Sequence, residues 1–226
     1  GRFAEIEPKD NLVKLGAGNF SSKVAVKLSG LGYDLSFLRT IPGTIGGAIA
    51  MNAGCYGEYM GDYVQSIEGF DKSGKFTRVI RESIQFDYRS SGLPKNFIIT
   101  SAVLKPKRGK KRVIQQKMKE MLSKREETQP TKKATCGSTF KNPDGKSSFI
   151  SETSIELKAW NLIDRAGLRG KKIGRAMVSK KHPNFMINLG GATAEEIESL
   201  GEYVRKSVYK KFKVSLDWEV IRVGRK

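Results

Sequence analysis

The sequence predicts an α+β protein built from two parts, and three observations support this prediction. Residues 12–104 contain short apolar runs separated by glycines and polar residues, a pattern typical of strands in a mixed sheet. Residues 105–133 are strongly basic and carry apolar residues at helical spacing. The clearest helical pattern of the chain then begins at Thr193. We therefore expect a first domain over residues 1–110 and a second domain over residues 111–226.

The first part is expected to contain one short helix and several strands. Apolar residues at helical spacing, followed by a glycine that can end a helix, predict the helix over residues 21–31. The apolar positions are Val24, Leu28 and Leu31, and the glycine is Gly32. The strongest strand signals are the apolar runs at residues 64–67, 76–80 and 97–103. This mixture of elements makes the first part α+β.

The basic stretch at residues 105–133 has 12 Lys and Arg against 3 Glu. Apolar residues recur inside it at helical spacing, at Ile114, Met118, Met121 and Leu122. This pattern predicts an amphipathic helix with a basic outer face. Such a face could bind nucleic acid, or it could be the solvent-exposed side of a helix that connects two lobes. The lack of interleaved aromatic residues favours the second interpretation.

Two helices are predicted in the second part. The first is marked by three apolar residues at helical spacing and by Gly167, which can end it. The three residues are Leu157, Trp160 and Ile163. The second helix begins at Thr193, where the sequence Thr-Ala-Glu-Glu predicts a capping box with Glu196. Its apolar stripe consists of Ile197, Leu200, Val204, Val208 and Phe212.

Composition limits the classes of function. The chain has 226 residues, 38% of them hydrophobic, and a net charge of +19, so it can form a core and lacks the composition of a disordered chain. Its positive field attracts phosphate-bearing molecules or anionic membranes. The uncharged run at residues 40–57 contains Pro42 and five glycines, which argues against a membrane span. With only Cys55, Cys136 and His182 available as ligands, we expect no metal site. Reduced thiols suit a cytoplasmic protein better, although the two cysteines could form a bridge in an exported protein.

The segment Ile-Pro-Gly-Thr-Ile-Gly-Gly-Ala at residues 41–48 is the first candidate binding loop. Its proline would stiffen the entry of the loop. Its three glycines would let the backbone approach a ligand and point successive N–H groups at a phosphate or at ring oxygens. Residues 48–53 could then begin a helix whose positive end faces the same anion. The alternative interpretation is a tight structural turn.

Three further segments place polar or charged side chains beside aromatic residues or glycines, at residues 86–91, 137–143 and 216–220. Taken alone, the arginine of the first segment is typical of a surface ion pair. The serine of the second is typical of a turn, and the glutamate of the third is typical of a solvated strand. Their combination with the glycine-rich loop is what indicates a site.

In this combination and order, the sequence closely resembles the UDP-N-acetylenolpyruvoylglucosamine reductases, the flavoenzymes of bacterial peptidoglycan precursor synthesis. The resemblance covers nearly the whole chain. It rests on the segments already described and on further ones at residues 161–170, 178–185, 188–193 and 219–220. Several separate motifs in the right order are far more specific than any one of them.

The resemblance implies both the fold and the activity. The expected fold is the C-terminal part of a vanillyl-alcohol-oxidase-type FAD-binding domain, followed by an α+β substrate-binding domain. The expected reaction is the NADPH-dependent reduction of the enolpyruvyl group of UDP-N-acetylglucosamine enolpyruvate to UDP-N-acetylmuramate, with FAD as the hydride carrier. This step belongs to peptidoglycan synthesis, and hence to cell wall biogenesis, cell shape, the cell cycle and cell division.

The resemblance also implies the residues of the site. Arg89 would stabilise the enolate-like charge, Ser138 would deliver the proton, and Glu219 would polarise or orient the reacting group. The residues expected to bind the substrate are Tyr88, Lys141 and Asn142. The residues expected to bind the cofactor are Pro42, Gly43, Thr44, Ile45, Gly46, Gly47, Ala48 and Asn52.

The chain departs from the family in three places. The family carries a further glycine-rich loop for the FAD pyrophosphate, upstream of the region matched here, so we expect these 226 residues by themselves to hold FAD weakly. Ile221 follows the terminal Glu-Val, where an arginine is usual, and Arg222 comes next. Residues 144–158 form a longer link than is usual after the serine motif.

Two other functions stay open from the sequence. A basic protein that binds nucleic acid without catalysis would show tight, strongly salt-dependent binding. Related FAD-binding folds serve other oxidoreductases, so a flavoenzyme with another substrate is the second alternative. We expect the UDP-sugar reductase, acting as a cytoplasmic monomer on small-molecule substrates, with neither nucleic acid nor membrane as a partner.

Overall fold

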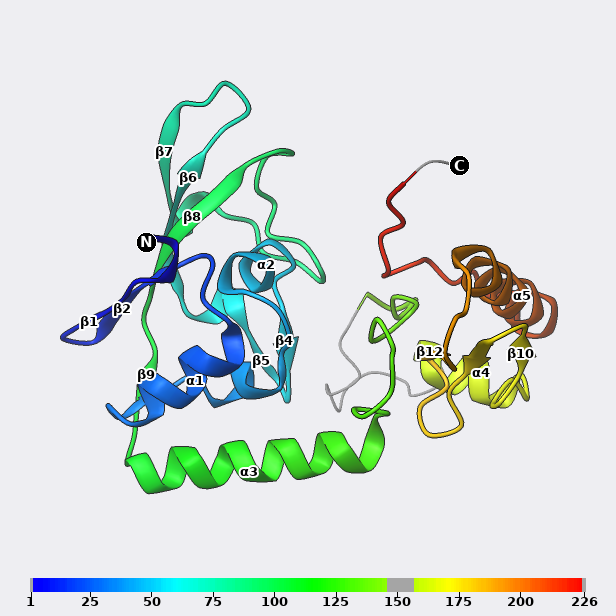
Figure 1. The fold of residues 1–226 in the computed structure, drawn as a ribbon. Helices are drawn as coiled ribbons and strands as arrows, with labels where there is room; N and C mark the ends of the chain where they lie inside the picture. The colour runs from blue at the N-terminus through cyan, green and yellow to red at the C-terminus, as the bar shows by residue number, and fades with distance from the viewer. Residues whose placement is uncertain (1, 146–156, 225–226) are drawn as a thin grey trace. The chain divides into compact units, whose positions relative to one another are not determined.

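The structure is a computed structural model that describes residues 2–145 and 157–224, and Figure 1 shows its helices and strands. Both helices and antiparallel strands occur in its two halves, which confirms the α+β class. The long link expected at residues 144–158 lies mostly outside the described residues. Within the described ranges, no helix has the length and apolar character needed to cross a membrane.

The chain forms two compact units, Gly1–Lys124 and Arg125–Lys226. The division falls inside α3 (Lys111–Thr128), so most of this helix belongs to the first unit. The functional domains expected at residues 1–110 and 111–226 stay a prediction.

A five-stranded antiparallel sheet forms the frame of the first unit. In spatial order its strands are β1 (Ile6–Lys9), β2 (Leu12–Gly16), β8 (Ile98–Leu104), β6 (Val64–Phe70) and β7 (Phe76–Ile80). The strands predicted at residues 64–67, 76–80 and 97–103 are therefore confirmed. Because β8 lies between β2 and β6, the sheet is complete only once the chain has reached residue 104.

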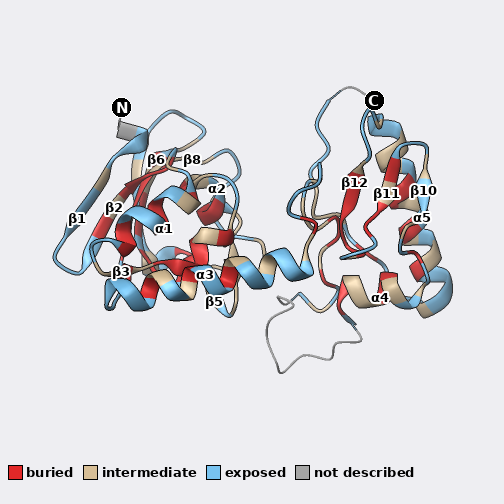
Figure 2. Cartoon of the chain, turned by 60° about the horizontal axis from the view of Figure 1, so that its bottom comes forward, coloured by how far each residue is buried: buried red, intermediate tan, exposed pale blue. Residues whose placement is uncertain are grey.

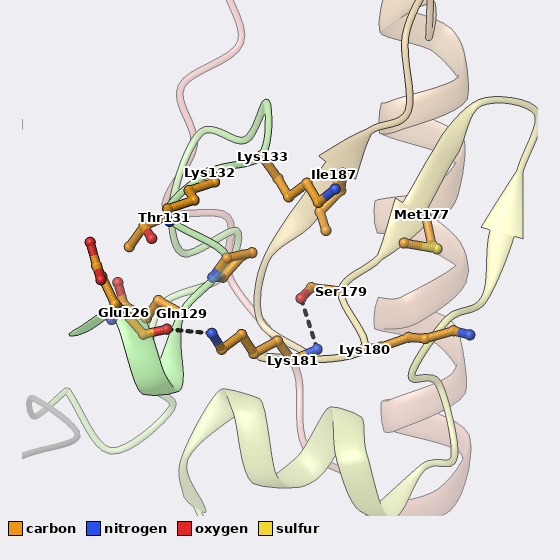
Figure 3. A pocket seen from close by; sticks show the side chains of 11 residues that line it. Glu126, Gln129, Thr131, Lys132, Lys133, Met177, Ser179, Lys180, Lys181 and Ile187 are labelled. Carbon is orange, nitrogen blue, oxygen red and sulfur yellow. Dashed lines mark hydrogen bonds between the residues drawn. The ribbon is translucent and has the colours of Figure 1, made fainter. Parts of the chain in front are cut away.

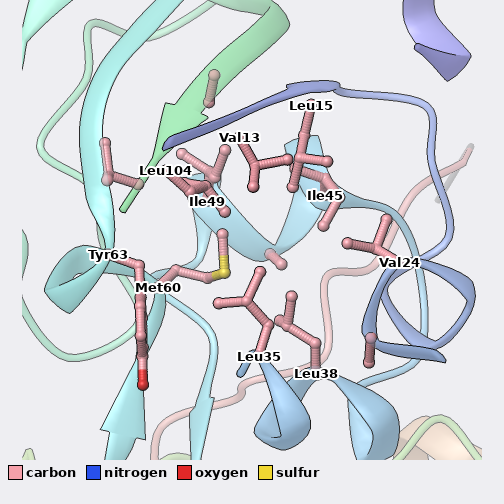
Figure 4. Packing of buried hydrophobic residues seen from close by; sticks show 14 of the residues in the cluster. Val13, Leu15, Val24, Leu35, Leu38, Ile45, Ile49, Met60, Tyr63 and Leu104 are labelled. Atoms are coloured by element: carbon pink, nitrogen blue, oxygen red, sulfur yellow. The ribbon is translucent and has the colours of Figure 1, made fainter. Parts of the chain in front are cut away.

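Two helices pack their apolar residues against this sheet, α1 (Ser21–Ser29) and α2 (Ile45–Ala50). Val24 of α1, Ile49 of α2 and Leu104 of β8 are 0% exposed and belong to one hydrophobic cluster, shown in Figure 4. This cluster fixes the start of α2, and hence the glycine-rich loop, relative to the sheet.

The end predicted for α1 is wrong by two residues. Leu31 is 50% exposed and lies on a turn, because the chain reverses at Gly32 (φ 76°) to begin β3. The remaining short elements of this unit are η1 (Arg2–Ala4), β3 (Tyr33–Asp34), η2 (Ser36–Thr40), β4 (Gly54–Cys55), β5 (Glu58–Tyr59), η3 (Met60–Asp62), η4 (Arg81–Ser83) and β9 (Lys107–Arg108).

The helix predicted in the basic stretch is α3, and its apolar row is buried as expected. The buried residues are Ile114, Met118 and Met121, whereas Leu122 is half-buried. Lys117 reaches two half-buried carboxylates, Glu58 Oε2 at 3.0 Å and Asp34 Oδ2 at 3.4 Å. Part of the basic charge of α3 therefore stabilises the first unit itself.

The second unit combines a small antiparallel sheet with two helices. Its strands are β10 (Lys172–Ile173), β11 (Ala176–Val178) and β12 (Met186–Asn188), and its helices are α4 (Ala159–Arg165) and α5 (Ala194–Phe212). Figure 2 shows buried residues along β11 and β12. Val178, Ile163 and Val204 are 0% exposed and join the sheet, α4 and α5 in one core.

The capping box predicted for α5 is confirmed. Thr193 Oγ1 accepts a hydrogen bond from Glu196 N, and Thr193 N donates to Glu196 Oε2, both at 3.1 Å. In the middle of the predicted stripe Leu200, Val204 and Val208 are 0% exposed. Ile197 and Phe212, at its two ends, are only partly buried. The local sequence thus fixes both the start of the helix and its buried side.

Of the stripe predicted for α4, Ile163 is confirmed at 0% exposure, whereas Leu157 and Trp160 are wrong. Leu157 precedes the helix and is 40% exposed, and Trp160 is only half-buried. The buried side is formed by Ala159, Leu162 and Ile163. This i, i+3, i+4 set contains an alanine, a weak hydrophobic signal, which explains why the larger residues predicted a different side. Gly167 ends the helix as expected, with φ 75°.

Gly201 lies on the buried side of α5, against the ring of Trp218. A Cβ at Gly201 would come within 1.9 Å of Trp218 Cη2. We expect Gly201→Ala to lower the free energy of unfolding by about 1–3 kcal/mol through overpacking. This reverses the usual helix preference for alanine over glycine, worth about 1 kcal/mol.

Urea unfolding followed by circular dichroism measures the effect of Gly201→Ala. Ser199→Ala is the matched control, because Ser199 is exposed on the same helix and its change should leave stability unchanged or slightly raised. An equal or higher stability of Gly201→Ala would contradict the close packing on Trp218.

Candidate functional site

The glycine-rich loop leads directly into α2, and three of its N–H groups are hydrogen-bonded within the protein. Ile45 N and Gly46 N donate to carbonyl oxygens of the turn at residues 17–19, both at 2.9 Å. Gly47 N donates to Thr44 Oγ1, which caps the helix, at 3.3 Å. The expectation that Gly46 and Gly47 aim N–H groups at a ligand is therefore wrong. The helix also begins three residues earlier than predicted, because this hydroxyl and the 17–19 turn stabilise its first turn.

The glycines of this loop have different roles. A Cβ at Gly46 would lie 3.0 Å from Ala17 Cβ, so Gly46 allows α2 to approach the 17–19 turn. Gly43 is exposed, has φ 92°, and has nothing within 4 Å of a built Cβ. Pro42 and Gly47 are exposed as well. Gly43 therefore presents bare backbone at the surface of this loop. The loop residues that face the core are Ile45 and Ala48.

Arg89 lies in a tight turn that Asn52 ties to the end of α2. Asp87 N donates to Ser90 O at 2.9 Å, and Ser90 N donates to Asp87 O at 3.2 Å. Arg89 has φ 55°, and its guanidinium carbon lies 4.9 Å from the centre of the Tyr88 ring. Asn52 is 7% exposed, and its Nδ2 donates to the Asp87 carbonyl at 3.1 Å. Three predicted site residues therefore meet in this region of the first unit.

The segment that carries Ser138 pairs with two other segments of the second unit. On one side Ser138 pairs with Phe185, and on the other Phe140 pairs with Trp218. Glu219 N donates to the carbonyl of the residue after Ser138 at 2.9 Å. Two of the predicted catalytic residues, Ser138 and Glu219, therefore lie on adjacent segments. Arg89 belongs to the other unit.

Asn184 holds this arrangement, and sequence reasoning did not predict it as a polar contact. The residue is 4% exposed. Its Nδ2 donates to Phe140 O at 2.8 Å and its Oδ1 accepts from Phe140 N at 3.0 Å. Its carbonyl accepts from Thr139 N at 2.7 Å. Asn184 therefore fixes the register of the Ser138 segment through both backbone and side chain.

The two residues predicted to bind substrate after Ser138 have different surroundings. Lys141 is half-buried. Asn142 is 7% exposed, and its Oδ1 accepts from Ala159 N at the start of α4 at 3.1 Å. Close by, Lys158 Nζ lies 2.6 Å from Asp144 Oδ2, with the lysine side chain 2% exposed. Nothing in the sequence pattern predicts such a buried lysine, which together with Asn142 anchors the start of α4.

His182 of the same unit is half-buried and uncharged at neutral pH. Its ring packs edge-on against Phe185, with centroids 4.7 Å apart, and its Nδ1 is buried without a hydrogen-bond partner in the described part of the chain. Arg169 lies nearby, held by Asp164 at 2.6 Å and by the Lys180 carbonyl at 2.7 Å. Burial, together with the positive charge of Arg169, lowers the pKa of His182 to about 4.

A basic pocket of about 380 Å³ opens in the second unit, as Figure 3 shows. Met177 and Ile187, which pair across β11 and β12, line its apolar side. The lysines that line it are Lys132, Lys133, Lys180 and Lys181, and Glu126 is its acidic residue. Lys181 Nζ donates to the Glu126 carbonyl. The pocket combines an apolar wall with excess positive charge, which suits a phosphate-bearing organic ligand.

Thiols and metal ligands are sparse in the described residues. Cys55 is half-buried, Cys136 is exposed, and neither forms a disulfide bond in the described part of the chain. Among the residues that the structure describes, no group of three or more His, Cys, Asp and Glu side chains is placed to hold a metal ion.

Known proteins match both units. Residues 1–80 match a family described as an FAD binding domain. Residues 129–223 match the C-terminal domain of UDP-N-acetylenolpyruvoylglucosamine reductase. The crystal structure of UDP-N-acetylenolpyruvylglucosamine reductase from Thermus caldophilus matches 98% of this chain and 76% of its own, with a TM-score of 0.79 at 34% identity.

Curated relatives match nearly the whole chain. UDP-N-acetylenolpyruvoylglucosamine reductase from Dinoroseobacter shibae is 50% identical over 94% of this chain and 69% of its own length. The protein of the same name from Paracoccus denitrificans is 46% identical over 99% of this chain and 73% of its own length.

The low pKa of His182 has a consequence for stability. Between the ordinary pKa of 6.5 and the folded-state pKa of about 4, the unfolded chain binds a proton that the folded chain does not. The contribution of His182 to stability is therefore present above about pH 6.5 and is lost as the pH falls toward about 4.

Proton NMR of this one histidine ring tests the prediction. We expect its resonances in the folded chain to titrate near pH 4, and in the urea-unfolded chain, which serves as the control, near pH 6.5. Equal midpoints in the two states would contradict the burial of the neutral ring.

Proposed function

The chain belongs to the UDP-N-acetylenolpyruvoylglucosamine reductase family, and we propose that it reduces the enolpyruvyl group of this UDP-sugar to give UDP-N-acetylmuramate. It is an FAD-dependent oxidoreductase of peptidoglycan precursor synthesis. The observation that supports the reaction most is the pairing in the second unit, which sets the Ser138 segment beside that of Glu219.

The exposed backbone edge of the glycine-rich loop would hold the flavin ring. Gly43 and Gly47 present no side chain there, and Pro42 stiffens the approach. When bound and reduced by NADPH, FAD would supply the hydride that reduces the double bond. Asn52 would support this loop from within the first unit, since its side chain is engaged with Asp87 and Gly61.

Three side chains would stabilise the charge, donate the proton and orient the reacting group. Hydride addition at one alkene carbon places negative charge on the other carbon and on the adjoining carboxylate. The Arg89 guanidinium would stabilise this charge, and the Ser138 hydroxyl would deliver the proton. Glu219 would orient the reacting group. Tyr88, against which the Arg89 guanidinium packs, would bind the substrate with the half-buried Lys141. Asn142, already bonded to Ala159, would set the position of that lysine.

NADPH is our proposed reductant, and the basic pocket of the second unit supports it. NADPH and the UDP-sugar both carry phosphate groups. Lys132 and Lys133, at the rim of the pocket, would attract either of them through charge. The net charge of +19 would favour the same anions at longer range.

We further infer that the protein works as a cytoplasmic monomer without nucleic acid or membrane. Neither Cys55 nor Cys136 forms a disulfide bond among the described residues, which fits a reducing compartment. The engagement of Lys117 with Glu58 and Asp34 supports a structural role for part of the basic helix. Gel filtration with and without added RNA tests this inference, and a shift in elution on adding RNA would contradict it.

Ser138→Ala separates the two half-reactions. We expect flavin reduction by NADPH to stay within about twofold of the parent, because no proton from Ser138 is needed there. Reoxidation by the enolpyruvyl UDP-sugar should slow about 10²- to 10⁴-fold, the usual contribution of a positioned proton donor. Stopped-flow absorbance of the FAD-loaded protein measures both rates. Ser215→Ala, an exposed serine of the same unit, is the control, and an equal loss in both half-reactions would count against the proton role.

The double variant Lys132→Gln, Lys133→Gln tests the pocket. We expect the KM for NADPH or for the UDP-sugar to rise about 3- to 10-fold, because two positive charges that are partly screened by solvent are lost. The kcat should stay nearly unchanged. This increase in KM should become smaller at high salt, where the parent and the variant both bind the ligand weakly. Lys206→Gln with Lys210→Gln removes the same charge from α5 and serves as the control. An equal change in KM in both pairs would assign the effect to net charge alone.

A further inference from the structure

We propose that Asn52 is a positioning residue for Arg89, and that it acts by tying the turn at residues 87–90 to the end of α2. The inference rests on the proposed function, in which Arg89 stabilises the charge that develops on the substrate. It gives Asn52 a role that differs from direct contact with the cofactor.

The side chain of Asn52 joins three separate segments of the first unit. Its Nδ2 donates to the Asp87 carbonyl at 3.1 Å, and its Oδ1 accepts from Gly61 N at 2.9 Å. Its own N–H donates to Ile49 O of α2 at 3.0 Å. Because Asn52 is only 7% exposed, water has little access to replace these partners. One buried amide therefore connects the glycine-rich loop, residue 61 and the base of the turn.

Asparagine meets three demands at this position. Its φ of 39° lies in the left-handed region, which asparagine tolerates better than most residues. The side chain must donate to a carbonyl and accept from an N–H at the same time. Among short side chains, an amide does this with two separate atoms, a nitrogen that donates and an oxygen that accepts. An ionised aspartate offers acceptors only and would repel the Asp87 carbonyl. Glutamine places the same amide one methylene farther away.

The bond from Asn52 reaches the turn at its base. Asp87 O accepts from Ser90 N at 3.2 Å in addition to Asn52, and Asp87 N donates back to Ser90 O at 2.9 Å. Arg89 stands inside this two-bond turn with φ 55°. Since the turn is short and closed, a shift of the Asp87 carbonyl carries the Arg89 guanidinium with it.

A packing contact fixes the same base and depends on the same amide. A Cβ at Gly61 would lie 2.7 Å from Phe86 Cγ, so the Gly61 backbone packs directly against the ring that precedes Asp87. Asn52 holds Gly61 on one side and Asp87 on the other. Its loss would loosen the turn both through the missing bond and through the glycine against which Phe86 packs.

Stopped-flow measurement of both half-reactions tests the inference on the FAD-loaded full chain. For Asn52→Ala and Asn52→Asp we expect flavin reduction by NADPH within about twofold of the parent. Reoxidation by the enolpyruvyl UDP-sugar should slow about 10- to 100-fold, the cost of a misplaced group at the reacting centre. Asn96→Asp is the control, since Asn96 is exposed, has φ 68° and undergoes the same change from amide to carboxylate.

A double-mutant cycle shows whether Asn52 acts through Arg89. In the background of Arg89→Ala, Asn52→Ala should slow reoxidation by less than about twofold further, because the group that it positions is gone. A second readout needs no cofactor. Amide exchange measured by NMR should speed up at Gly61 N and Ser90 N in Asn52→Ala, while amides of the five-stranded sheet keep the protection of the parent.

The outcomes separate this inference from the reaction on which it rests. Reoxidation within twofold of the parent in Asn52→Ala, or an equal loss with and without Arg89, would overturn the positioning role. Loss of protection across the whole first unit would overturn it as well, since Asn52 would then act on the fold. A parent protein that the enolpyruvyl UDP-sugar does not reoxidise would overturn the proposed function, and this inference with it.

Discussion

The amide of Asn184, bonded to both the N–H and the carbonyl of Phe140, is the interaction on which the second unit's site depends. Successive residues of an extended segment point to opposite sides, so a slip by one residue would turn Ser138 away from its present side. The two bonds prevent this slip. They also hold the Phe140 ring, which is 1% exposed, 5.0 Å from the ring of Trp218. Through that contact the position of Glu219 follows from the position of Phe140.

The first unit uses the same kind of side chain for a similar purpose. Asn52 and Asn184 are both nearly buried, and each donates and accepts with one amide. In both units the residues proposed for chemistry lie beside these amides on segments without regular secondary structure. A buried amide that has both of its partners fixes such a segment, because breaking either bond leaves a polar group unpaired away from water.

Local patterns predicted the local parts of the fold. The capping box at Thr193 depends on residues three positions apart, and the strands of the large sheet depend on apolar runs. The predictions were wrong where residues distant in the sequence determine the structure. The buried side of α4 is set by the core that it shares with α5 and the small sheet, and the 17–19 turn accepts the Gly46 N–H that was expected to face a ligand. Asn184 and its partner Phe140 are 44 residues apart, and no periodic pattern in the sequence predicts a hydrogen bond over that distance.

The packing of Trp218 against Gly201 also gives the molecule a built-in optical label. The chain has two tryptophans, Trp160 and Trp218, and both lie in the unit Arg125–Lys226. Emission excited at 295 nm, where tyrosine hardly absorbs, therefore reports this unit alone, with the indole of Trp218 in contact with α5. The five-stranded sheet of the other unit contains none. A denaturation curve from emission and one from far-ultraviolet ellipticity would coincide only when the two units unfold as one cooperative system.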